Sequence, residues 1–126
     1  TIKNYYIHEV SNCNTYETIK NSLFVIAMYS TAIQFAVFMR KPIVFVTTDE
    51  LKNTQAGKNT YVIAKLLGCN VINLSSQKQI NSSNINLEVN EHLYKKFVGN
   101  YLKYPGSANK NATSIIIDYF EKLIVC

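Results

Sequence analysis

The sequence predicts one α/β domain of three layers, with a mostly parallel sheet of about four strands, helices on both faces and two C-terminal helices. The chain has 126 residues, the length of one domain, and 48% of them are hydrophobic, enough for a core of its own. Short apolar runs alternate with segments of helical periodicity. Alternation at this spacing favours parallel strands joined by right-handed crossovers.

Four segments are predicted to be strands because they are short, β-branched or aromatic, and bounded by polar turns. They are residues 2–7, 23–28, 43–46 and 70–74. The second is continuously apolar, as strands are when helices cover both faces of a sheet. The third follows Pro42, which ends the preceding helix.

Helices are predicted between and after these strands, over residues 14–21, 32–39, 61–67, 90–102 and 115–124. Asn14 followed by Glu17 has the form of a capping box, and Gly68 suits a helix C-terminus. The second of these helices is apolar nearly all round and is therefore expected to be buried.

Two segments are predicted to lack regular structure. Residues 51–59 are polar and include Gly57, so we expect a mobile loop there. Residues 75–86 have few apolar side chains and are expected to be irregular. Neither segment interrupts the order of strands and helices.

The charge of the chain argues against nucleic acid as a partner. The net charge is +5, but the lysines are scattered and the single arginine is Arg40, whereas nucleic-acid binders cluster their basic residues. We expect instead a mild attraction to anionic ligands or to a membrane surface. No apolar stretch approaches the roughly 18 residues of a membrane helix. The chain is therefore expected in the cytoplasm, with peripheral membrane contact left open.

Neither a metal nor a cofactor is expected. The two histidines, His8 and His92, are not accompanied by a cluster of cysteines or acids. Cys13, Cys69 and Cys126 form no CxxC pair, which favours reduced cytoplasmic thiols over disulfides. Cys13 could be a nucleophile, although a plain buried or surface thiol is the simpler interpretation.

Polar residues follow three of the predicted strands, where ligands bind in open α/β sheets. Ser30 and Thr31 follow the second strand and precede a helix, so their hydroxyls and the free N–H groups of the helix could hold a phosphate. Helix capping by either side chain is the alternative, and it needs no ligand. Lys110 could also reach a phosphate, with a solvated lysine as the default.

The other two clusters are less specific. Thr48, Asp49 and Glu50 follow the third strand and could bind a ribose or sugar hydroxyl, or cap the next turn. His8 could act as a general base or contact a base ring, and Glu9 could accept hydrogen bonds from a ribose diol. A solvated surface position is the alternative for both.

The order of these residues resembles a known family. A strand, the turn HEVS and a short helix precede the run NSLFVIAMYSTAIQFAVFMRKPIVFVTTDEL, which spans residues 21–51. This succession resembles the C-terminal Rossmann-like domain of GT-B-fold glycosyltransferases. It is most similar to bacterial capsule and surface-polysaccharide enzymes with an STAI…KPI segment. The similarity covers residues 2–51 well and the later helices loosely.

The resemblance implies that this is the domain that binds a nucleotide-sugar donor. The implied contacts are Ile7, His8 and Glu9 with the base and ribose, Ser30 and Thr31 with the phosphates, and Thr48, Asp49 and Glu50 on the side of the donor sugar. The sequence departs from the family pattern in two respects. The E-x7-E pattern of many retaining members is absent, and Arg40 stands where glycine often precedes Lys-Pro.

The resemblance also sets expectations for the whole protein. The acceptor-binding N-terminal domain, which usually carries the catalytic base, is not in these residues, so the chain is expected to be a C-terminal fragment that transfers no sugar by itself. The donor could be a UDP sugar or a CMP sugar. The alternative function is a non-enzymatic, flavodoxin-like regulatory or interaction module.

Overall fold

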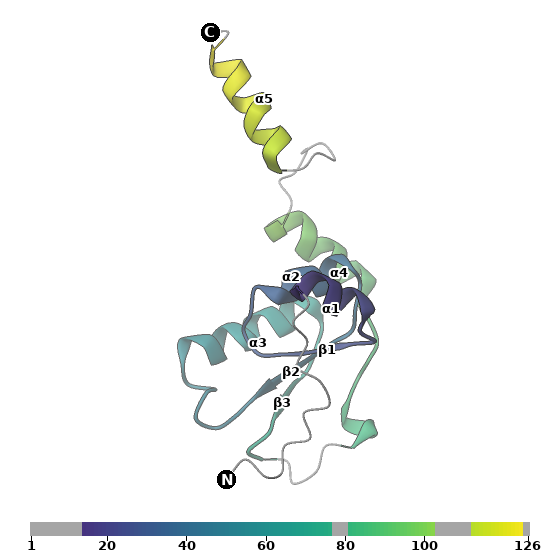
Figure 1. The fold of residues 1–126 in the computed structure, drawn as a ribbon. Helices are drawn as coiled ribbons and strands as arrows, with labels where there is room; N and C mark the ends of the chain where they lie inside the picture. Colours follow the sequence, from purple (N-terminus) through teal and green to yellow (C-terminus); the bar gives the residue numbers. More distant parts are fainter. Residues whose placement is uncertain (1–13, 77–80, 103–111, 125–126) are drawn as a thin grey trace.

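The computed structural model describes residues 14–76, 81–102 and 112–124 (Figure 1). Strands and helices alternate there, as the sequence predicts for an α/β domain; the predicted strand 2–7 lies outside the described residues. In chain order the elements are α1 (Thr15–Asn21), β1 (Val25–Ala27), α2 (Ala32–Phe38), β2 (Ile43–Thr47), α3 (Gln55–Leu67), β3 (Val71–Asn73), the 3-10 helix η1 (Ser82–Asn84), α4 (Glu91–Phe97), the π-helix η2 (Val98–Leu102) and α5 (Ala112–Ile124).

The described strands form one open parallel sheet in the order β1-β2-β3. Val25 of β1 lies beside Ile43 of β2, and Phe45 of β2 lies beside Val71 of β3. Helix α2 connects the first pair of strands and α3 connects the second. The fold class is therefore confirmed as α/β with a parallel sheet, and three strands are described where about four are predicted.

The helices of the core pack on one face of the sheet. Side chains alternate along a strand, so Ile43 and Phe45 point to one face and Val44 to the other. The core cluster joins Ile43 and Phe45 to residues of α1, α2, α3 and α4. On the opposite face Ile26 of β1 is 62% exposed, and Val44 of β2, although only 6% exposed, does not belong to the cluster that the helices form. The expected helices on both faces are therefore not found among the described residues.

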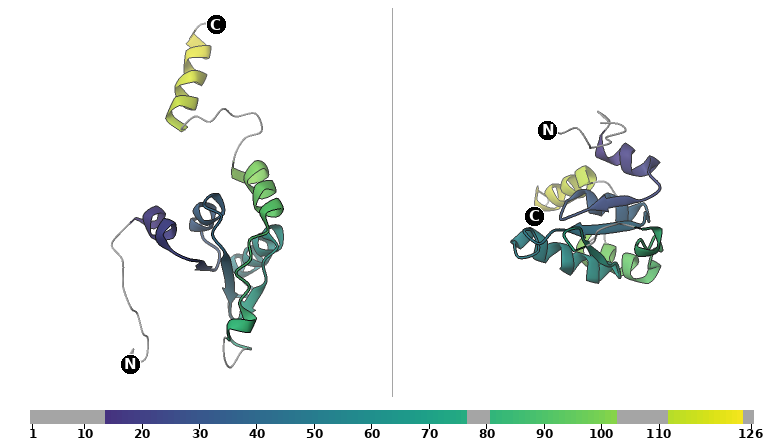
Figure 2. Two further views of the ribbon diagram at one scale, coloured as in Figure 1. Left: turned by 90° about the vertical axis from the view of Figure 1, so that its right-hand side faces the viewer. Right: turned by 90° about the horizontal axis from the view of Figure 1, so that it is seen from below.

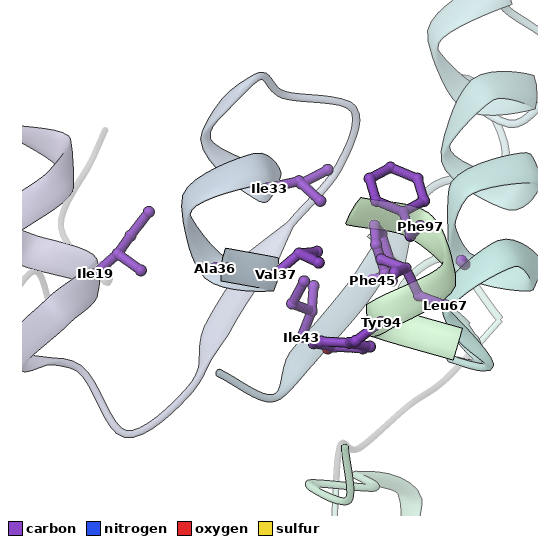
Figure 3. Packing of buried hydrophobic residues seen from close by; sticks show 10 residues of the cluster. Ile19, Ile33, Ala36, Val37, Ile43, Phe45, Leu67, Tyr94 and Phe97 are labelled. Atoms are coloured by element: carbon purple, nitrogen blue, oxygen red, sulfur yellow. The ribbon is translucent and has the colours of Figure 1, made fainter. Parts of the chain in front are cut away.

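Figure 3 shows how this core closes between sheet and helices. Ile33 of α2 points toward the sheet, and Leu67 of α3 and Phe97 of α4 lie near Phe45 of β2. Phe45 and Leu67 have no exposed surface. Complete burial of one such side chain contributes about 1.5–3 kcal/mol, so these contacts hold the helices in place over the strands.

Helix α2 is only half buried, which corrects the prediction of a helix covered on all sides. Ile33 and Val37 face the sheet and are buried, whereas Phe35 is 41% exposed and Phe38 is 54% exposed. Tyr16 of α1 packs edge-on against the ring of Phe35. The outer side of α2 is thus partly covered by α1, and Phe35 and Phe38 remain partly open to solvent.

Helix α3 begins six residues earlier than predicted, so the expected loop over residues 51–59 is confined to the turns of residues 51–54. Thr54 is the N-cap, and its hydroxyl accepts a hydrogen bond from the N–H of Gly57 at 3.1 Å. The sequence did not predict this helix start, because the first turn of α3 is polar, contains a glycine and lacks an apolar periodicity. The predicted C-terminus is confirmed, since Gly68 has a left-handed backbone with φ of 72°.

Two other predicted helix starts are confirmed by their caps. Asn14 Oδ1 accepts a hydrogen bond from the N–H of Glu17 at 2.9 Å, at the start of α1. Asn90 Oδ1 accepts one from the N–H of Leu93 at 3.0 Å, at the start of α4. These side chains take up N–H groups that have no partner within the helix.

Helix α5 stands apart from the sheet and from the other helices in both Figure 1 and Figure 2. It is amphipathic, as predicted, with a wide apolar face. That face is open to solvent: Ile116, Tyr119, Phe120 and Leu123 are between 55% and 63% exposed.

Candidate functional site

Polar residues gather at one edge of the sheet, because parallel strands have their carboxyl ends on the same side. Ser30 and Thr31 follow β1, residues 48–50 follow β2, and Asn73 ends β3. Two of the three clusters singled out in the sequence are therefore brought to one edge. The other candidates lie outside the described residues: Ile7, His8, Glu9 and Lys110.

A pocket of about 70 Å³ opens at this edge, between the ends of β1 and β2 and the start of α3. Thr47 and Thr60, each 1% exposed, form its inner side. Tyr29, next to Ser30 in the chain, is 53% exposed at its mouth. The complete lining is Met28, Tyr29, Thr47, Leu51, Ala56, Gly57 and Thr60.

Gly57 allows the turn after β2 to approach α3 closely, and this approach shapes the pocket. A Cβ atom at Gly57 would overlap the carbonyl oxygen of Leu51 and lie 2.8 Å from the Cα atom of Lys52. Real Cβ atoms essentially never come that near to backbone atoms. The local sequence therefore needs glycine at this position for packing, not for flexibility.

The pocket does not depend on a reversal of strand order. Many ligand crevices of open α/β sheets form where neighbouring crossovers run to opposite faces. The described strands follow one another in sequence order and offer no such point. Here the hollow is made by the turn that carries Leu51, which folds against the first turn of α3.

Ser30 and Thr31 differ in their hydrogen bonds. Ser30 Oγ accepts a hydrogen bond from the N–H of Ala32 at 3.2 Å. Thr31 is the N-cap of α2 by position, but its side chain makes no capping hydrogen bond. The capping alternative is thus realised by Ser30 and not by Thr31. A hydroxyl that accepts one hydrogen bond still has a proton to donate, so capping does not use up Ser30.

Asp49 fastens the turn after β2 to the end of β3. Its Oδ1 accepts hydrogen bonds from Asn73 Nδ2 at 2.9 Å and from Lys52 Nζ at 2.8 Å. Its N–H donates to Ser75 Oγ at 3.0 Å. The hydrogen bonds from Lys52 and Asn73 lower the pKa of Asp49, and the carboxylate in turn raises the pKa of Lys52. The group is therefore an anion at neutral pH that is already engaged by its own chain.

Glu50 is a second exposed carboxylate in the same turn. A hydrogen bond with the Thr48 side chain, followed by one with its own backbone, lowers the pKa of Glu50. Thr48 also holds the turn, because its carbonyl accepts from the N–H of Lys52 at 2.9 Å. Glu50 is thus ionised, and it stands in solvent beside the pocket residue Leu51.

Three residues of this edge were missed in the sequence: Lys52, Asn73 and Ser75. Lys52 fell within the segment interpreted as a mobile loop. Ser75 follows the last predicted strand, so the rule that found the other clusters would have found it too, whereas Asn73 was placed inside that strand. Polar residues after every strand, not only after the first three, were the available signal.

Other chemistry has little support in the described part of the chain. No group of three or more His, Cys, Asp or Glu side chains is placed there to hold a metal ion. Cys69 is a free, partly buried thiol, and burial raises its pKa, which disfavours the reactive thiolate. None of the described helices is both long and apolar enough to cross a membrane.

Comparisons with protein families, with curated proteins and with solved structures found no match to this chain.

Proposed function

We propose that the edge of the sheet around the pocket binds a nucleotide-sugar donor. In this proposal the chain is the donor-binding half of a glycosyltransferase in bacterial surface-polysaccharide synthesis, as the resemblance over residues 2–51 suggests. The observation that carries the proposal is the convergence at one edge of three things: two adjacent hydroxyl side chains, a small pocket and a turn with two carboxylates.

Ser30 and Thr31 are the proposed contacts of the donor phosphates. Both are exposed and lie after β1 at the carboxyl edge of the sheet, next in the chain to the pocket residue Tyr29. The O–H of Ser30 can donate to a phosphate oxygen while its lone pair accepts from Ala32. The proposal relies on these hydroxyls and not on a helix dipole, because α2 has only seven residues.

Thr48, Asp49 and Glu50 are the proposed neighbours of the donor sugar. Ionised carboxylates accept hydrogen bonds from sugar hydroxyls, and both pKa values are lowered here. Because Asp49 is held by Lys52 and Asn73, the turn is positioned before any ligand arrives. Such preorganisation lowers the entropy that binding must spend.

Catalysis is assigned to another domain. The carboxylates of Asp49 and Glu50 are held in hydrogen bonds that lower their pKa values, whereas a general acid needs a raised one. We therefore propose that an acceptor-binding domain supplies the catalytic base, that no cofactor takes part, and that this chain alone transfers no sugar. The proposed setting is the cytoplasm, with peripheral contact to a membrane and without nucleic acid.

The test is calorimetric titration of the chain with UDP, CMP, uridine and cytidine. We expect one nucleotide to bind and its nucleoside to bind more weakly. Replacing Ser30 and Thr31 together by alanine should weaken nucleotide binding at least about tenfold, because each hydrogen bond to a charged group contributes roughly 1.5–3 kcal/mol. Nucleoside binding should hardly change.

A matched control is the double replacement of Ser82 and Ser83, two adjacent exposed hydroxyl residues of η1. It should leave nucleotide affinity as it is. If the Ser30 and Thr31 variant loses only stability and binds nucleotide as before, these residues are caps and the proposal is wrong.

The non-enzymatic interaction module remains the second candidate, and one observation favours it. Large apolar side chains are exposed around β1 and α2: Leu23, Ile26, Phe35 and Phe38. Exposed apolar groups of this kind mark protein contacts. Absence of binding to every nucleotide would favour this candidate.

A further inference from the structure

The pocket is lined mainly by apolar atoms. Thr60 Oγ1 donates to the carbonyl of Ala56 at 2.9 Å, and Thr47 Oγ1 donates to the carbonyl of Thr48 at 3.5 Å. Both threonines are buried, and Met28, Leu51 and Ala56 add apolar side chains to the lining. An apolar group of a ligand is therefore favoured here, and a ligand hydroxyl finds few polar partners.

The size of the pocket limits what can enter. A cavity of about 150 Å³ holds benzene, and water takes about 30 Å³ in the liquid. The volume of about 70 Å³ lies between these values. The pocket is therefore too small to enclose a nucleobase, which is larger than benzene, but has room for a group of a few heavy atoms.

The position of the pocket relates it to the proposed donor site. Tyr29 of its lining precedes Ser30, and consecutive Cα atoms are about 3.8 Å apart. Leu51 of its lining follows Glu50. The pocket therefore lies between the residues assigned to the phosphates and those assigned to the sugar, within reach of a substituent on the sugar ring.

We propose that this pocket receives a methyl-bearing substituent of the donor sugar. The acetyl group of an acetamido sugar and the methyl group of a 6-deoxy sugar share this chemistry. The inference rests on the proposed function, because it assumes that a nucleotide sugar binds at this edge. It goes further in naming the class of sugar.

The experiment compares UDP-N-acetylglucosamine, UDP-rhamnose and UDP-glucose by calorimetric titration of the whole chain. At least one of the first two should bind roughly fourfold or more tightly than UDP-glucose, the ratio expected for burial of one methyl group. Which of them is preferred identifies the source of the methyl group. If CMP binds and UDP does not, CMP-N-acetylneuraminic acid is compared with CMP-Kdo, which lacks the acetyl group.

The variant Ala56→Leu tests the location. Ala56 lines the pocket from an exposed position on α3, so a larger side chain there fills the space without breaking the helix. In this variant the methyl-bearing sugar and UDP-glucose should bind with about the same affinity. In the control Val62→Leu, on the same helix, the preference should persist, because Val62 is 57% exposed and does not line the pocket. Thermal melting checks that both variants fold.

Three outcomes overturn the inference. Equal affinity for sugars with and without the methyl-bearing group overturns it and leaves the proposed function standing. A preference that survives Ala56→Leu shows that the methyl group is recognised elsewhere. Absence of binding to any nucleotide or nucleotide sugar overturns both the inference and the proposed function.

Discussion

Gly57 lies where α3 and the turn after β2 come closest, and its replacement by alanine tests that packing. In an exposed helix, Gly→Ala stabilises by roughly 0.5–1 kcal/mol, because alanine has the higher helix propensity. Here the new Cβ would lie 2.7 Å from the carbonyl carbon of Leu51 and 2.8 Å from Cα of Lys52. Both are backbone atoms, so no flexible side chain can move aside.

The clash should outweigh the gain in propensity. Overpacking in a well-packed region costs typically about 1–3 kcal/mol. Subtracting the gain in propensity leaves a net loss between about 0 and 2.5 kcal/mol, centred near about 1 kcal/mol, for Gly57→Ala. Urea unfolding, followed by circular dichroism, measures this as a lower midpoint with an unchanged slope.

Gly99→Ala is the matched control, because a Cβ atom at Gly99 in η2 meets nothing within 4 Å. This variant should be as stable as the wild type or more stable by up to about 1 kcal/mol. A Gly57→Ala variant that is also stabilised would refute the close approach of the turn to α3, and with it the shape of the pocket.

Three further predictions concern the framework around the site. Gly68→Ala should destabilise by about 1–2 kcal/mol in a thermal melt, because φ is 72° and the new Cβ would lie 2.8 Å from Leu93 Cδ1. Asp49→Asn should be less stable than the wild type at pH 7 but not at low pH: the lowered pKa of Asp49 gives stability above the ordinary value of 3.8 that is lost as pH falls through the folded value. A pH series of urea melts shows whether the two curves converge. Tyr94→Phe should cost about 1 kcal/mol in urea unfolding, since Tyr94 Oη donates to the carbonyl of Lys41 at 3.1 Å. Burial raises the pKa of Tyr94, so its contribution is complete below pH 10 and is lost as pH rises further.

The elements with a strong local signal could be predicted from the sequence. β2 is recognisable from its continuous apolar run. The end of α3 is recognisable from Gly68, because glycine readily adopts the left-handed backbone of a helix C-terminus. The cap at Asn14 is equally local, because it depends on residues three apart. These elements also fix which polar segments reach the carboxyl edge of the sheet.

Features that depend on tertiary contacts could not be predicted. The start of α3 is stabilised by the Thr54 cap and by packing against Leu51, and its own sequence is polar. The exposure of Phe35 and Phe38 depends on what covers the outer side of α2, which hydrophobicity alone does not reveal. In both cases a neighbour in space overrode the local pattern.

The candidate site shows the same division. That Asp49 stands after a strand follows from the sequence, but its partners Asn73 and Ser75 lie at the end of β3 and in the turn after it, 24 and 26 residues away. Only the parallel pairing of β2 with β3 brings them together. The pocket depends likewise on the contact between the turn after β2 and α3, and no sequence motif predicts that contact.

The most direct test of the donor-binding account is a titration of the ¹⁵N-labelled chain with UDP and CMP, followed by amide chemical shifts. The account predicts that the largest shifts occur at Ser30 and Thr31 and at residues 48–50, with smaller ones at Thr60 on the far side of the pocket. Shifts at α5 or around Ile26, with none at the carboxyl ends of β1 and β2, would contradict it.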